Sequence, residues 1–226
     1  MRSPSLYRIC GGSLIAAALL FTISALLAPI SPDHSLTALK PLVGGSWIGA
    51  AWLGILGFPL ALGALLGLYR HFTGSDQEGW AAIMLGTFVL GATLLVLCQA
   101  LTGIGQAMLL AQAGTPAEIA ALEPSQTALV AVITGAYVAG GALTWLTLVP
   151  MAVALIGDSA WPRLVAWGAL PVFVVEEALG MAFQTGPWMR LGTILGFAYL
   201  ALLGSTFMRF GRTAAAVPHA PSVAGV

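Results

Sequence analysis

Long runs of apolar residues alternate with short polar segments along this chain of 226 residues. Each run holds about 20 residues or more, and at about 1.5 Å per helical residue that length crosses a hydrocarbon core about 30 Å thick. The runs cover about residues 9–28, 44–69, 80–110, 127–156, 161–183 and 188–208. This pattern predicts an all-α fold, a polytopic transmembrane bundle of six helices.

The segments around the runs predict how the chain is divided. The first run is longer than the apolar part of a usual signal peptide and has no clean cleavage site after it, so we expect a retained helix. Residues 1–212 then form a single six-helix transmembrane domain, and the Ala- and Pro-rich residues 213–226 are expected to be a disordered C-terminal tail. Prolines and polar residues mark 30–42, 111–126 and 184–187 as connections, with one or two helical turns within 117–122.

Composition agrees with a membrane protein and excludes several other classes. Hydrophobic residues make up 59% of the chain and charged residues only 7%, against about 25% charged in soluble domains. The formal net charge is zero, so nothing indicates a nucleic-acid partner. The lipid bilayer is the partner that the composition predicts.

Basic residues predict the orientation of the six spans. If both termini lie in the cytoplasm, that side receives six arginines and the other side receives only Lys40 and Arg190. The six are Arg2, Arg8, Arg70, Arg163, Arg209 and Arg212. Because loops on the cytoplasmic side carry the excess of Lys and Arg, the count predicts an N-in, C-in topology for a multi-pass membrane protein.

No motif for a cofactor, a metal or catalysis is recognisable. Cys10 and Cys98 have no CxxC or CxxH neighbour, and HExxH, GxSxG and P-loop motifs are absent. His34, His71 and His219 fall outside or at the edge of the apolar runs, where they are poorly placed as axial haem ligands. Asp76 and Asp158 are expected in loops without a partner pattern. We therefore predict a protein that is not an enzyme and holds no cofactor.

Two adjacent carboxylates, Glu176 and Glu177, lie well inside the fifth run. Counted from about Leu164, Glu176 is twelve residues in, roughly 18 Å along a helix and slightly beyond the middle of the bilayer. The nearest cation is expected to be Arg190, at the start of the sixth run across a short turn, and its long side chain could bend inward. Either these carboxylates only hold helices together, or they form a proton, cation or polar-solute site, which is a common role of charges in membranes.

The third run carries a polar stripe. Gln99 and Gln106 are seven residues apart and so share one face of a regular helix, with Thr102 between them. A polar stripe in a membrane helix should face the bundle interior. It either forms interhelical hydrogen bonds or lines a polar cavity with the glutamates, and Glu176, Glu177, Gln99, Gln106 and Arg190 together form the candidate site.

Small residues recur four apart in several runs. Gly63 and Gly67, and then Gly192 and Gly196, have the GxxxG spacing, and Gly204 lies on the face of the latter pair. Such faces let helices approach closely in lipid. They predict close packing within the chain, or a homo-oligomer or membrane partner that docks on a glycine-rich face.

Four short motifs resemble a family of uncharacterised bacterial six-helix integral membrane proteins, the DUF4386-like group. They are Arg8–Gly11, Leu68–Arg70, the Gln99–Ala100 step and Trp161–Leu164, the last being similar to an aromatic-Pro-Arg-hydrophobic step at the start of that family's fifth helix. The resemblance covers about residues 6–210. It implies a six-helix fold in the bacterial inner membrane, with an acidic residue late in the fifth helix, and no established chemistry.

The chain departs from that family in having two glutamates in place of one acid and no Arg in the third helix. Two functions remain open. The first is an inner-membrane protein of non-enzymatic, accessory or stress-related role. The alternative is a small transporter or channel for a proton, cation or small polar solute that uses the intramembrane carboxylates.

Overall fold

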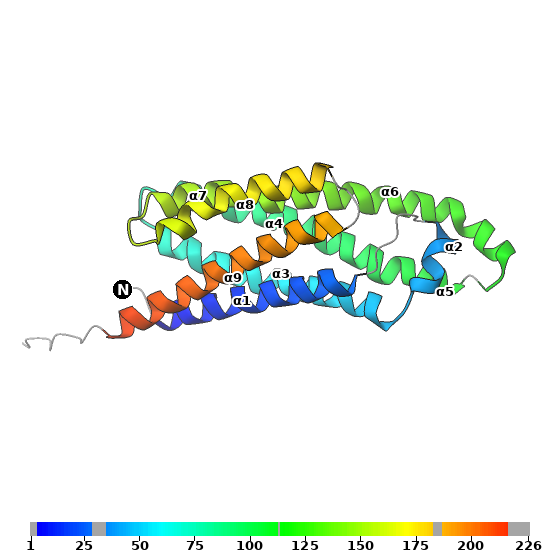
Figure 1. The fold of residues 1–226 in the computed structure, drawn as a ribbon, viewed down its shortest axis with the longest axis horizontal. Coiled ribbons are helices and arrows are strands. Elements are labelled where there is room, and N and C mark those ends of the chain that lie inside the picture. Colours follow the sequence, from blue (N-terminus) through cyan, green and yellow to red (C-terminus); the bar gives the residue numbers. More distant parts are fainter. Residues whose placement is uncertain (1–3, 29–34, 113, 183–186, 217–226) are drawn as a thin grey trace, which may run out of the picture.

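The computed structural model describes residues 4–28, 35–112, 114–182 and 187–216, and this part of the chain contains helices and no strand (Figure 1). The prediction of an all-α fold is confirmed. Side chains are described for fewer residues, because those of 177–182, 187–190 and 213–216 lie outside the described part. The helices are α1 (Pro4–Leu27), α2 (Leu36–Leu39), a 3-10 turn (Lys40–Leu42), α3 (Gly45–Phe72), α4 (Glu78–Ala100), a π-helical segment (Leu101–Gln106), α5 (Ala107–Gln112), α6 (Pro116–Leu146), α7 (Leu148–Ile156), α8 (Arg163–Ala182) and α9 (Pro187–Ala216).

Five helical stretches of the described residues are long and apolar enough to cross a membrane. They are Pro4–Leu27, Gly45–Phe72, Glu78–Gln112, Pro116–Ile156 and Leu191–Arg212, and their most apolar windows have mean hydropathies between 1.7 and 2.3. The third and fourth stretches join consecutive helices end to end, α4 to α5 and α6 to α7. These lengths and compositions are those of a multi-pass membrane protein.

The long helices run side by side along the long axis of the molecule (Figure 1). Helix α1 packs between α3 and α9, α4 packs between α3 and α6, and α8 packs between α7 and α9. The neighbours therefore close into a ring, with α8 and α9 joining the second half of the chain back to α1. Helix α1 begins and α9 ends at the same end of the bundle, which we call the terminal end (Figure 1).

The start of α6 corrects the sequence prediction, which placed a loop over residues 111–126. The helix begins at Pro116 because Thr115 and Glu118 form a capping box, in which Thr115 Oγ1 accepts from Glu118 N (3.3 Å) and Glu118 Oε2 accepts from Thr115 N (2.7 Å). Proline is well suited to a first helical position, where its missing N–H group needs no partner. The helix then continues through Pro124 into the predicted fourth run.

Two other predicted boundaries also move. Helix α9 extends to Ala216, so residues 213–216 are helical and not part of a disordered tail, while 217–226 lie outside the described residues. The predicted connection 30–42 contains α2 and the 3-10 turn, and the predicted turn 184–187 lies outside the described residues except for Pro187, the first residue of α9.

Helix α2 covers the end of the bundle opposite the terminal end. Its side chains Leu36 and Leu39 are buried with Trp47 of α3 and Leu110 of α5 in a second, small hydrophobic cluster. The backbone N–H of Leu36 donates to Glu123 of α6 at 3.3 Å. A four-residue helix is thereby held on α3, α5 and α6.

Glycines bring the helices of the ring into close contact. A Cβ on Gly11 of α1 would lie 2.5 Å from the carbonyl oxygen of Gly204 on α9, and a Cβ on Gly67 would collide with Cys10. Gly196 of α9 lies against Trp145 of α6. The glycine face of α9 is thus used for packing within the chain, whereas on α3 Gly67 is packed and a Cβ on Gly63 would meet nothing within 4 Å.

Candidate functional site

Glu176 lies in the interior of the bundle. Its side chain is 6% exposed, and its Oε1 accepts a hydrogen bond from the backbone N–H of Gly196 at 3.2 Å. A Cβ on Gly196 would lie 2.7 Å from that oxygen and would collide with the Trp145 ring, so the absence of a side chain at 196 makes room for both groups. The carboxylate of α8 therefore sits between α9 and the indole of α6.

Tyr137 of α6 belongs to the same region. It lies within electrostatic range of Glu176 and of Cys98 of α4. Its side chain is nevertheless 42% exposed, so the ring also reaches the outer surface of α6.

A layer of aromatic rings fills the interior beside Glu176. Phe21 of α1 contacts Phe58 of α3 with ring centroids 4.9 Å apart and stacks on Phe197 of α9 at 5.1 Å. Phe197 in turn lies 6.2 Å from Trp145. The layer crosses from α3 to α6 and ends at the indole that borders the carboxylate.

The other members of the predicted site are placed differently or are not described. The side chains of Glu177 and Arg190 lie outside the described residues. Gln99 faces α3 and α1, since a Cβ on Gly54 would lie 3.2 Å from its Cδ atom and 3.1 Å from Ser24 Oγ. Ser24 donates to the carbonyl oxygen of Ala50 at 2.7 Å. Gln99 therefore lies beside a polar contact between α1 and α3.

Gln106 is 4% exposed and ends the π-helical segment Leu101–Gln106. A π-helical turn holds more residues than an α-helical one, so the rule that residues seven apart share a face does not apply across it. Gly103 within the segment lies directly against Ala51 of α3. The segment brings α4 close to α3 and changes the phase of the helix between Gln99 and Gln106.

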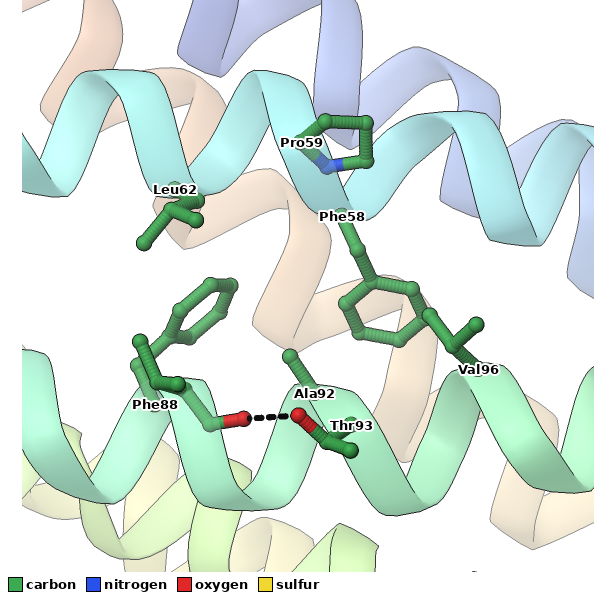
Figure 2. Close-up of a pocket in the computed structure, with 8 residues that line it drawn as sticks. Phe58, Pro59, Leu62, Phe88, Ala92, Thr93 and Val96 are labelled. Carbon is green, nitrogen blue, oxygen red and sulfur yellow. Dashed lines mark hydrogen bonds between the residues drawn. The ribbon is translucent and has the colours of Figure 1, made fainter.

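An apolar cavity of about 300 Å³ lies between α3 and α4 (Figure 2). It is lined by Phe58, Pro59, Leu62, Phe88, Val89, Ala92, Thr93 and Val96. The hydroxyl of Thr93 donates to the carbonyl oxygen of Val89 in its own helix at 2.8 Å and so adds little polarity (Figure 2). Glu176, Gln99 and Gln106 do not line this cavity.

A second polar group lies at the terminal end, and the sequence analysis missed it. Nδ1 of His71 lies 2.8 Å from the Tyr7 hydroxyl of α1, and Nε2 lies 2.7 Å from Asp158 Oδ2 in the turn between α7 and α8. The indole N–H of Trp161 points at Nε2 from 3.4 Å. We call these four residues the His71 cluster, and they correct the expectation that Asp158 has no partner.

The described part of the chain contains no group of three or more His, Cys, Asp or Glu residues arranged to hold a metal ion. Cys10 and Cys98 are buried free thiols on separate helices.

Comparisons of the chain with family models, with curated proteins and with solved structures find no match. The resemblance to the DUF4386-like group therefore stays a prediction.

Proposed function

We propose that this protein is a small, non-enzymatic transporter or channel of the bacterial inner membrane, in which Glu176 takes up and releases a proton or a monovalent cation. The observation that carries the proposal is the burial of this carboxylate, 6% exposed, inside a bundle of apolar helices. Ionisable groups at membrane depth are costly and usually belong to ion or proton pathways.

The contacts of Glu176 suit reversible binding. One backbone N–H at 3.2 Å gives a bond of moderate strength to either form of the carboxyl group, since an uncharged carboxyl also has an accepting oxygen. Tyr137 lies within electrostatic reach of the carboxylate, and its hydroxyl group can donate or accept a hydrogen bond. We propose Glu176 with Tyr137 as the core of the site, and Gln99 and Gln106 as polar groups of the same bundle.

The proposal includes six membrane crossings and both termini in the cytoplasm. Helix α8 is 20 residues long and packs beside α7 and α9, which suits a sixth span. Arg8, Arg70, Arg163 and Arg209 belong to helix ends at the terminal end, whereas Lys40 lies at the opposite end (Figure 1). By the positive-inside rule, the terminal end is the cytoplasmic one.

A second candidate is an accessory or stress-related component that acts through a membrane partner or a second copy. The outer face of α6 favours it, because only Gln126, Ala136 and Gly140 are buried along the 31 residues of that helix. Helix α6 packs mainly against α4. The α9 glycines first considered for docking are buried within the chain, so α6 is the better docking face.

Infrared spectroscopy of the purified protein tests the site. The C=O stretching band of a protonated carboxyl group should grow in the wild-type protein as the pH falls from about 9 to about 5. Glu176→Gln should remove part of that change, whereas Glu78→Gln, which replaces a loop-side carboxylate bonded to Gly74 N and Tyr69 Oη, should leave the same part intact. Identical carboxyl bands in wild-type protein and Glu176→Gln at every pH would mean that Glu176 does not exchange a proton.

A further inference from the structure

The His71 cluster joins three segments that are far apart in the chain. Tyr7 comes from the first turn of α1, His71 from the last turn of α3, and Asp158 and Trp161 from the turn that leads into α8. The imidazole is almost fully buried, while the Asp158 side chain is 24% exposed and reaches water. The cluster is therefore an inter-segment contact whose buried centre is an ionisable ring connected to the solvent.

The distances determine where one proton lies. Asp158 Oδ2 accepts hydrogen bonds when ionised, and the Trp161 indole can only donate, so Nε2 cannot satisfy both at once. The 2.7 Å contact is typical of a charge-assisted bond, whereas 3.4 Å is long for an N–H donor. Nε2 therefore carries hydrogen and donates to Asp158.

The other ring nitrogen can change its state without losing its partner. A tyrosine hydroxyl donates or accepts, so the 2.8 Å contact with Tyr7 persists whether Nδ1 is bare or protonated. Rings surround the group on its other sides, with Phe72 and Trp161 edge-on to the imidazole at centroid distances of 4.8 and 5.7 Å. Addition of a proton to His71 thus needs no rearrangement of the cluster.

The charges facing the imidazole favour its protonated form. Two titratable groups contact it, Tyr7 from α1 and Asp158 from the α7–α8 turn, and the rings of Phe207 and Phe210 from α9 pack on Tyr7 and Trp161. On α3 itself the neighbouring Arg70 is exposed. A carboxylate oxygen therefore lies 2.7 Å from the imidazole.

We propose that the His71 cluster is a pH-responsive clasp at the terminal end of the bundle. At acidic pH the imidazolium pairs with Asp158 and fastens α1 and the α7–α8 turn to α3, and as the pH rises the neutral ring holds them less firmly. The sign follows from the contact, because the folded protein offers the imidazolium a carboxylate that the unfolded chain does not. The stability gained is present at low pH and is lost as the pH rises through the titration of His71.

Thermal unfolding in detergent at pH 5.5 and pH 8 tests the clasp. Between pH 8 and pH 5.5, the Tm of the wild-type protein should rise by about 3 °C more than the Tm of a His71→Gln variant. Tyr69→Phe, which removes a hydroxyl bonded to Glu78 at the same end of α3, is the matched control and should keep the wild-type pH dependence. A wild-type pH dependence that persists in His71→Gln would overturn the proposal.

Asp158→Asn provides a second test that does not depend on the folding of His71→Gln. The amide keeps a hydrogen-bonding group beside Nε2 but removes the negative charge, so a buried imidazolium would no longer be compensated. Protonation of His71 should then destabilise the fold instead of stabilising it. The difference between the Tm at pH 5.5 and the Tm at pH 8 should therefore be more negative in Asp158→Asn than in the wild-type protein. An unchanged difference would show that the Asp158 charge does not act on His71.

Discussion

Replacing Gly11 with Ala should lower the Tm of the protein by about 5 °C. The new Cβ would lie 2.5 Å from the carbonyl oxygen of Gly204 and 2.9 Å from the backbone N of Met208, so α1 and α9 must move apart. Overpacking of this kind costs about 1–3 kcal/mol, and each kcal/mol lowers the Tm by roughly 2–4 °C in a chain of this size. Circular dichroism of the purified protein in detergent during heating would measure the change.

Gly12 is the matched control for this experiment. It is the next residue of the same helix, and a Cβ there meets nothing within 4 Å. Gly12→Ala should therefore leave the Tm unchanged or raise it slightly, since Ala is the better helix former. Equal losses from the two substitutions would mean that α1 and α9 do not cross at Gly11 and Gly204.

Much of this fold could be predicted from the apolar runs, because a helix that crosses lipid must satisfy its own backbone and show apolar side chains over about 20 residues. The start of α6 was also recognisable. Thr115-Pro116-Ala117-Glu118 has the capping-box spacing, although Pro116 and Pro124 by themselves are typical of a loop. A proline in the first turn begins a helix, and that signal was missed.

The candidate site was only partly predictable. The cost of a carboxylate inside an apolar run identified Glu176 without any structure. Its neighbours depend on the register of α8 against α9 and α6, which placed Gly196 and Trp145 beside it. The π-helical segment arises where Gly103 meets α3, and it disturbs the regular period on which the Gln99–Gln106 stripe was based.

The His71 cluster shows where local patterns fail. Its hydrogen-bonded pairs are 64 and 87 residues apart, and no period of a helix or a turn relates residues at such separations. His71 at a helix end and Asp158 in a loop are each ordinary in isolation. Only the packing of the helix ends at one end of the bundle brings them together.

Replacing Glu176 with Gln should abolish the ion flux that we propose for this protein. The amide is nearly isosteric and can still accept from Gly196 N, but it neither binds a proton in this pH range nor carries a charge that attracts a cation. The flux should fall at least tenfold, to the level of vesicles without protein. Thermal unfolding should differ little from that of the wild-type protein, because the hydrogen bond and the packing are kept.

The most direct measurement is the rate of proton, Na⁺ and K⁺ entry into proteoliposomes under an imposed gradient, with wild-type protein, Glu176→Gln and Glu78→Gln prepared in parallel. Glu78→Gln removes a carboxylate outside the bundle interior and is the matched control. The account predicts flux of one of these ions in the wild-type protein and in Glu78→Gln, and background rates in Glu176→Gln. Flux in Glu176→Gln equal to that of the wild-type protein, or no flux of any of the three ions in the wild-type protein, would contradict it.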